Sequence, residues 1–281
     1  MPELSFHIHS ADLDQVAPES TRLILQAGET HLVVLLTDNA SGKIIALHYY
    51  RFPAGEIDEA YRSILESDSL LKRDTGERVV VSHYREHVLV PSILYAGEGA
   101  ERILAMIHGD LRRGTPMQDS LETLGIQNLH RMPEDLEASL KQALPGASIL
   151  HESTLVLRWL SDHREMLPSV YVYLQVYPSQ VTVTVMRDGI CQLVQTYPYD
   201  IPEDLSYHLL NTCEQLGLDP EQVPLIVSGL IDPESPLFLE LLKYFRHLET
   251  HSASACGPQD PALGEVPPHY FTPQNILAVC A

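Results

Sequence analysis

Residues 23–82 contain three strand-like stretches, a helical stretch and a further strand: LILQA (23–27), HLVVLLTD (31–38), KIIALHYYRF (43–52), GEIDEAYRSILESDSLL (55–71) and ERVVVS (77–82). Residues 170–228 repeat this order: VYVYLQV (170–176), QVTVTVMRD (180–188), ICQLVQTYPYD (190–200), IPEDLSYHLLNTCEQLG (201–217) and VPLIVS (223–228). Gln26 and Gln175 hold matching places, as do Val34 and Val183, and both pairs are 149 residues apart. The repeat predicts two related domains of the α/β class, each with a mixed sheet that joins a three-stranded antiparallel meander to parallel strands and helices.

The second strand of the first unit is apolar on both faces. Val34 and Leu36 point to one side of the expected sheet, and Val33 and Leu35 point to the other. This pattern is typical of a strand that is covered on both faces.

Length and composition indicate a globular protein. The chain has 281 residues, of which 44% are hydrophobic and 20% charged, which suits two domains of ~100–150 residues each. The formal net charge of −20 repels phosphate backbones and anionic lipids, so it argues against a nucleic-acid partner and against a membrane-surface role. We interpret this charge as a source of solubility rather than as a means of recognising a basic partner.

We expect no signal for export in this sequence. The first residues, MPELSFHIHSADLDQ, lack a basic segment followed by an apolar core, and the longest apolar runs fall short of the ~20 residues of a membrane helix. The four cysteines form no CxxC or other short pairing, which is typical of free thiols in a reducing compartment: Cys191, Cys213, Cys256 and Cys280. The sequence therefore predicts a cytoplasmic protein.

Residues 87–167 separate the two units and alternate helical with strand-like stretches. We expect this segment to continue the sheet of the first domain. The boundary then lies near Pro168, with a first domain at 1–167 and a second at 168–281 that includes a C-terminal tail. The tail HYFTPQNILAVCA (269–281) is apolar enough to pack against the body of the protein.

This doubled unit resembles the ribonuclease-H-like domains of the superfamily that holds sugar kinases, actin and heat-shock chaperones. A closer resemblance is to a bacterial family, the domain-of-unknown-function family three-eight-two-two, whose members are regarded as having an actin-like ATPase fold. It rests on four stretches: HVLVPSILY (87–95), YPYDIPEDLSYHLLNTCEQLGLD (197–219), PLIVSGLIDPESPLFLELLKYF (224–245) and HYF (269–271). Membership implies the fold, with two ribonuclease-H-like domains around a cleft, and no established activity.

The resemblance also implies where nucleotide chemistry would lie. Active members of the superfamily carry an Asp at the end of the first strand of each domain, followed by a glycine-rich hairpin that holds phosphates. Those acid positions here carry Gln26 and Gln175, and a neutral amide neither attracts Mg²⁺ as a carboxylate does nor acts as a base. Gly28 remains in the first hairpin, whereas the second has Tyr177 and Pro178, and proline removes an N–H donor.

The third element of the nucleotide site also departs from the pattern. Active members end an adenosine-contacting strand with two glycines, but LIVSGLI (225–231) keeps Gly229 and has Leu230 in the second place. A branched side chain there would crowd a nucleotide. We therefore predict a degenerate inter-domain cleft near Gln26, Gly28, Gln175 and Gly229, with no catalytic residue, no metal and no cofactor.

A different alignment register would assign the acid to Asp38 or Asp188. Both lie in expected hairpin turns, where Asp commonly has a structural role. This leaves open a nucleotide-binding site with displaced acids.

The histidines do not predict a metal site. His7 and His9 would place both rings on one face of a strand, but no nearby Cys or acid pair completes a ligand set, so exposure near the N-terminus is the simpler interpretation. Two further pairs have i, i+4 spacing in extended stretches, where the rings need not converge: His83 with His87, and His247 with His251. The motifs HExxH, GxSxG and GxxxxGK[ST] do not occur.

Our first hypothesis is a non-catalytic binding or scaffold protein, a pseudoenzyme on a degenerate actin-like ATPase fold. Such a body would bind a protein segment or a small molecule in its cleft or at a sheet edge, or pair with a second copy as a homo-oligomer. The alternative is a nucleotide-binding ATPase or kinase with displaced acidic residues. A nuclease needs acids on the first strand of each unit and on its neighbours, which carry almost none, so this hypothesis is the weakest.

Overall fold

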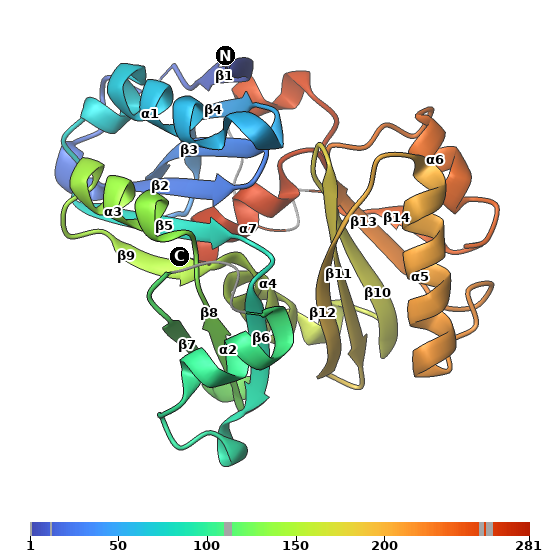
Figure 1. The fold of residues 1–281 in the computed structure, drawn as a ribbon. Helices are drawn as coiled ribbons and strands as arrows, with labels where there is room; N and C mark the ends of the chain where they lie inside the picture. The colour runs from blue at the N-terminus through green and yellow to red at the C-terminus, as the bar shows by residue number, and fades with distance from the viewer. Residues whose placement is uncertain (1, 12, 110–113, 253–255, 257–260) are drawn as a thin grey trace.

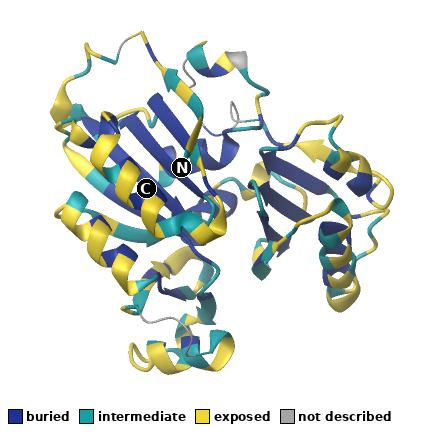
Figure 2. Ribbon diagram, turned by 45° about the horizontal axis from the view of Figure 1, so that its top comes forward, coloured by how far each residue is buried: buried dark blue, intermediate teal, exposed yellow. Residues whose placement is uncertain are grey.

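The computed structural model describes every residue except 1, 12, 110–113, 253–255 and 257–260. Two sheets lie next to each other, and a third, smaller sheet projects from the first (Figure 1). The strands of the two larger sheets are mostly buried, whereas the helices that cover them expose their outer faces (Figure 2). None of the described helices combines the length and hydropathy that a bilayer crossing requires.

The first sheet contains the first repeat unit. Its six strands lie in the order β1-β4-β3-β2-β5-β9, with bounds β1 Glu3–His9, β2 Thr21–Gly28, β3 His31–Asp38, β4 Ile44–Arg51, β5 Glu77–His83 and β9 Ser148–His151. Strands β2, β3 and β4 form the antiparallel meander, and β5 pairs with β2 in parallel after helix α1 (Ile57–Ser67). The predicted unit is therefore confirmed, and β1 extends the meander by pairing with β4.

The second sheet repeats this arrangement. Its strands lie in the order β12-β11-β10-β13-β14, with bounds β10 Val170–Val176, β11 Gln180–Arg187, β12 Ile190–Pro198, β13 Leu225–Gly229 and β14 Leu248–Thr250. Helix α5 (Pro202–Leu216) precedes the parallel strand β13, and α6 (Pro236–Leu241) precedes β14. Strands β3 and β11 correspond residue for residue at the offset found in the sequence.

The segment between the repeats departs from the prediction. Strands β6 (His87–Pro91), β7 (Met117–Leu121) and β8 (Ile126–His130) form a separate antiparallel sheet in the order β6-β8-β7, accompanied by α2 (Ala100–His108). Only β9, which follows α3 (Glu134–Ala143), joins the first sheet. The expected continuation of that sheet is wrong for β6, β7 and β8. Strands β7 and β8 pair across a short connection, and β6 pairs with the other edge of β8. The alternation of strands and helices in the sequence does not reveal which strands pair.

Strand β3 lies between two hydrophobic cores, as its two apolar faces predicted. Val34 and Leu36 pack in the core that contains side chains of α1 and α3. Val33 and Leu35 pack in a second core on the opposite face of the sheet. Both faces of this sheet are therefore covered by helices, which explains the apolar run.

Two helices, α4 (Glu152–Asp162) and α7 (Thr272–Cys280), lie between the two large sheets (Figure 1). Leu155 of α4 packs in the core of the first sheet, and Trp159 of the same helix packs in the core of the second. Helix α7 does the same with Leu277 and Ile276. Because both helices belong to both cores, the boundary at residue 168 stays a prediction.

Candidate functional site

The hairpins β2–β3 and β10–β11 meet where the two sheets face each other. Ser179 Oγ, in the second hairpin, donates a hydrogen bond of 2.9 Å to Thr30 Oγ1 in the first. The buried rings of His31 and Tyr177 stack with a centroid distance of 4.8 Å and an interplanar angle of 12°. The two hairpins that the resemblance predicts at a nucleotide site therefore contact each other directly.

Gln26 and Gln175 point at one buried carboxylate, that of Glu152. Gln26 Nε2 donates to Glu152 Oε2 over 2.8 Å, and Gln175 Nε2 donates to Glu152 Oε1 over 3.0 Å. Gln26 is 0% exposed, Gln175 is 1% exposed and Glu152 is 2% exposed. The structure thus brings together the two residues that the sequence placed at the degenerate acid positions, with a third residue bridging them.

Two further side chains complete this network, which we name the Glu152 network (Gln26, Glu152, Gln175, Tyr177 and Gln274). The Tyr177 hydroxyl donates to Glu152 Oε1 and accepts a hydrogen bond of 3.1 Å from Gln26 Nε2. Gln274 Nε2, from α7, donates to Gln26 Oε1 over 2.9 Å. The network therefore joins β2 of the first sheet and β10 of the second to the two central helices.

Glu152 is the first residue of α4, directly after β9. A carboxylate in the first turn of a helix interacts favourably with the helix dipole and with free backbone N–H groups. Burial nevertheless raises the pKa of Glu152 to about 7, against the hydrogen bonds from Tyr177, Gln26 and Gln175, which lower it. Near neutral pH this carboxyl group can therefore hold or release a proton inside the protein.

His83, the last residue of β5, lies between Glu152 and two side chains of the second sheet. Its Nε2 lies 3.1 Å from Thr182 Oγ1, and its Nδ1 lies 3.2 Å from Gln180 Nε2 and 3.5 Å from Glu152 Oε2. Burial lowers the pKa of His83 to about 3, so the ring is neutral at physiological pH. The ring therefore lines the site and takes part in its hydrogen bonds, and it carries no positive charge.

Gly28 and Gly229 have structural roles in this geometry. A Cβ at Gly28 would lie 2.4 Å from the Cε1 atom of the His31 ring. Gly229 has a φ of +92°, and a Cβ there would lie 2.2 Å from the Val176 carbonyl oxygen. The backbone N–H of Gly229 donates to the His269 carbonyl over 2.8 Å, so close backbone packing explains this glycine without a nucleotide.

The alternative acids lie at the other ends of their strands. Asp38 pairs with Thr21 in the sheet register, whereas Gln26 lies near the hairpin end of the same strand pair. The Asp38 carboxylate accepts hydrogen bonds from the backbone N–H of Ser41 (2.8 Å) and from Ser41 Oγ (2.7 Å), and these bonds lower the pKa of Asp38. Asp188 follows β11 with a φ of 52° in the turn before β12. Neither acid lies at the Glu152 network.

Sequence reasoning missed Glu152, because it lies at a junction between a strand and a helix, 23 residues from Gln175 and 126 from Gln26 along the chain. The signal that could have found it is an acid at the start of a helix of which eight residues, Glu152 among them, are buried. A charged group at such a place needs partners. No local pattern says which partners.

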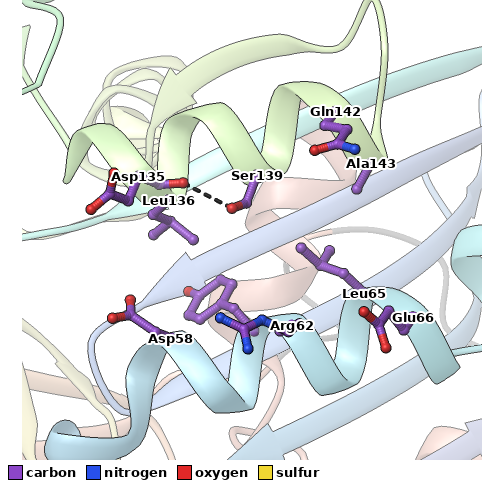
Figure 3. A pocket seen from close by; sticks show the side chains of 10 residues that line it. Asp58, Arg62, Leu65, Glu66, Asp135, Leu136, Ser139, Gln142 and Ala143 are labelled. Atoms are coloured by element: carbon purple, nitrogen blue, oxygen red, sulfur yellow. Dashed lines mark hydrogen bonds between the residues drawn. The ribbon is translucent and has the colours of Figure 1, made fainter.

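Three surface hollows have no residue of this network in their lining. A groove of about 610 Å³ runs between α1 and α3 on the outer face of the first sheet, and Figure 3 shows acidic, basic and apolar side chains along it, among them Asp58, Arg62, Leu65, Asp135 and Gln142. Two adjoining hollows of about 410 and 320 Å³ share Ile107, His108 and Gln195, and lie between α2 and β12. A group that could hold a metal ion, among the described residues, is formed by His7, His9 and His48 at the outer edge of the first sheet.

The family and the fold follow from comparisons with known proteins. The profile of a family described as protein of unknown function (DUF3822) matches residues 10–248. A Bacteroides thetaiotaomicron VPI-5482 protein with an actin-like ATPase fold and unknown function is similar, with a TM-score of 0.77 and 14% identity, over 94% of this chain and 97% of that chain. The PilM–PilN type IV pilus biogenesis complex contains a chain with a TM-score of 0.54 and 17% identity, over 94% of this chain and 98% of that one.

At these identities the two structures show the fold alone. No curated protein matches the sequence. The predicted actin-like ATPase fold, with its mixed α/β sheets, is confirmed. Because the family profile covers most of the chain, the protein belongs to the DUF3822 family.

Proposed function

We propose that this protein is a non-catalytic binding or scaffold protein that retains the actin-like ATPase fold and fills the nucleotide position with its own side chains. The observation that carries the proposal is the Glu152 network, in which Gln26 and Gln175 both donate to a buried carboxylate. In active members of the superfamily that the sequence resembles, an Asp at each of these positions orients Mg²⁺ and water. Here they hold the two halves of the protein together.

Closed packing around the network supports this proposal. Tyr177 is 1% exposed, and its ring lies on His31 in the place where a phosphate loop would need free N–H groups. Gly28 and Gly229 are accounted for by contacts with His31 and Val176. A nucleotide would have to displace buried, hydrogen-bonded side chains, which costs several hydrogen bonds at once.

The alternative, a nucleotide-binding ATPase or kinase, is favoured by one observation. Glu152 is a carboxylate placed between the two hairpins, and it could replace the missing acids if the hairpins separated. This alternative assigns Mg²⁺ binding to Glu152 rather than to Asp38 or Asp188.

A thermal-shift series separates the two functions. The protein is heated alone and with ATP, ADP or GTP, each with Mg²⁺, because a ligand that binds only the folded state raises the melting temperature. An unchanged melting temperature with all three nucleotides supports the binding or scaffold function. A rise of several degrees that disappears in Glu152→Gln favours the ATPase.

The surface best suited to a protein partner lies between α2 and β12. Strand β12 is the edge of the second sheet and β6 the edge of the small sheet, and an edge strand offers unpaired backbone groups to an extended segment. The small sheet and its surroundings also carry large apolar side chains that are exposed: Ile93 (93%), Leu94 (76%), Met106 (80%) and Ile107 (56%). Exposed apolar groups that form a patch are typical of partner surfaces, and the similar chain of the PilM–PilN type IV pilus biogenesis complex belongs to a protein complex.

Matched variants test this surface. Ile107→Asp and Gln195→Arg alter the hollows between α2 and β12, and Arg62→Glu alters the groove between α1 and α3 as a control. Affinity capture from cells, with each variant shown to be folded, should recover a partner with the wild type and the control but not with Ile107→Asp or Gln195→Arg. A partner retained equally by all variants would place binding elsewhere.

A further inference from the structure

Three histidines from two paired strands meet at the outer edge of the first sheet. Strand β1 pairs with β4 so that His7 lies opposite His48, and His9, two residues further along β1, lies on the same face. One ring nitrogen of each side chain lies within 4.8 Å of the other two. We name these residues the His cluster (His7, His9 and His48).

The rings of the His cluster face one another closely. The rings of His7 and His48 stack with a centroid distance of 4.4 Å, and those of His7 and His9 lie 4.2 Å apart. His9 Nε2 lies 2.7 Å from His48 Nε2. In a tetrahedral zinc site with bonds of about 2.0–2.1 Å, two ligand nitrogens are about 3.3 Å apart, so a small outward movement of either ring admits the ion.

Asp68 orients His48 from the protein side. Its Oδ2 lies 2.7 Å from His48 Nδ1 and accepts a hydrogen bond of 2.7 Å from the Tyr50 hydroxyl, while its Oδ1 accepts one of 2.7 Å from the Leu70 N–H. Asp68 is 3% exposed and His48 is 2% exposed. With the proton on Nδ1, the lone pair of His48 lies on Nε2, inside the His cluster.

This arrangement matches the way proteins build zinc ligands. A histidine that binds a metal through one nitrogen almost always donates its other N–H to a carboxylate or carbonyl group, which fixes the tautomer and the ring. Imidazole suits Zn²⁺ among the common divalent ions, and three histidines leave a fourth position for water. His7 is exposed, so that fourth position can reach solvent.

The N–H groups of the nearby Arg73 guanidinium donate hydrogen bonds to Asp14 (3.2 Å) and to the Leu13 carbonyl (3.0 Å).

We propose that His7, His9 and His48 bind one Zn²⁺ ion, with Asp68 as the positioning residue of His48 and water as the fourth ligand. The ion would fasten the edge strand β1 to β4. The competing explanation is a stack of imidazoles held by hydrogen bonds alone, with no affinity for a metal. The two explanations differ in whether exposed His7 matters.

Titration of untagged, chelator-treated protein with Zn²⁺ against a chromogenic chelator tests the proposal. His7→Gln removes one ligand and leaves His9 and the buried His48. Asp68→Asn keeps the shape of the positioning residue, and His247→Gln changes an exposed histidine near the second sheet as a control. Circular dichroism establishes that each variant is folded. Co²⁺ in place of Zn²⁺ adds a ligand-field absorption band that reports coordination directly.

The wild type and His247→Gln should bind one equivalent of Zn²⁺ with the same affinity and give the Co²⁺ band. His7→Gln should lose the band and bind Zn²⁺ at least about tenfold more weakly, and Asp68→Asn should bind about 10–100-fold more weakly. Wild-type protein that shows no saturable binding overturns the proposal. Equal affinity of the wild type and His7→Gln overturns it as well, because binding would then lie elsewhere.

Discussion

Ser179 donates its side-chain hydrogen bond to Thr30, and these two residues are 149 positions apart, the same offset that relates Gln26 to Gln175. The contact therefore joins equivalent positions of the two repeats. Equivalent residues touch where a two-fold relation brings a surface against its own copy. Glu152 lies at this junction, and its carboxylate accepts a hydrogen bond from each glutamine. A single residue outside the repeat is therefore the hydrogen-bond partner of both equivalent glutamines.

We predict that the free energy of unfolding of Glu152→Gln, relative to that of the wild type, is higher at pH 8 than at pH 5. Burial raises the pKa of this carboxyl group from 4.5 to about 7. Between those pH values the unfolded chain binds fewer protons than the folded one, so the contribution of Glu152 to stability falls as pH rises, by a total on the order of 3 kcal/mol. Chemical denaturation at several pH values measures the difference between variant and wild type.

Glutamine can be accepted at this position because Gln274 Oε1 has no hydrogen-bond partner among the described residues. The side-chain amides of Gln26 and Gln274 can therefore both flip, so that the oxygen of Gln26 accepts a hydrogen bond from the amide N–H₂ group of the Glu152→Gln variant. The exposed residue Glu165 provides the control, and Glu165→Gln should give a curve parallel to that of the wild type. A parallel curve for Glu152→Gln would contradict the raised pKa.

We predict that the protein loses stability steeply as pH falls below 6.5. Burial lowers the pKa of five histidines, to about 3 for His83 and His87, to about 4 for His251, and well below 6.5 for His31 and His151. The unfolded chain protonates these rings near 6.5 and the folded chain does not, so each lowers the free energy of unfolding by up to about 1.4 kcal/mol per pH unit.

This acid effect has the opposite sign to that of Glu152 and outweighs it, because five groups act against one. Calorimetric unfolding at pH 5.5 in buffers of different ionisation enthalpy counts the protons taken up. Uptake of several protons per molecule is expected. Release of protons, or constant stability between pH 7 and pH 5, would show that the histidines are charged in the folded protein.

We predict that Gly229→Ala destabilises the protein by at least about 2 kcal/mol, because the left-handed φ of +92° and the 2.2 Å approach to the Val176 oxygen both penalise a Cβ. Gly55→Ala is the control, since a Cβ there would have nothing within 4 Å. Thermal melting without any ligand measures both variants. A Gly229→Ala protein as stable as the wild type would leave a nucleotide as the reason for this glycine.

We predict that Tyr177→Phe costs about 1–3 kcal/mol of stability at pH 8 and less at pH 5. The Tyr177 hydroxyl is a donor to Glu152 and an acceptor for Gln26, and its loss leaves the ionised carboxylate with fewer hydrogen bonds. Tyr207, which is 68% exposed, provides the control variant Tyr207→Phe. Equal losses at both pH values would mean that Glu152 does not change its charge between pH 5 and pH 8, which would contradict a pKa near 7.

The sequence predicted the repeated units because each carries its own periodicity and turn signals. Val33, Val34, Leu35 and Leu36 indicated a strand covered on both faces, and both faces are packed. The small sheet of β6, β7 and β8 was not predicted, because local antiparallel pairing competes with extension of a larger sheet and both satisfy the same alternation.

The candidate site was predicted in part. Gln26 and Gln175 were identified from the repeat, and their common partner Glu152 was not, because a buried hydrogen bond across 126 residues leaves no local pattern. The pair His7 and His9 was noticed, but the third imidazole, His48, comes from strand pairing between β1 and β4. Register between distant strands was the missing information in both cases.

The hydrogen bond from Gln274 to Gln26 joins residues 248 positions apart. At a synthesis rate of about 5–20 residues per second, Gln26 is added to the chain roughly 10–50 seconds before Gln274. Until α7 has been synthesised, the layer between the two sheets contains only one of its two helices. The interior of the newly made chain is therefore incompletely packed until synthesis ends. We therefore expect neither half of the chain to be soluble when it is expressed separately, because each half would expose surface that α7 or α4 covers in the whole protein.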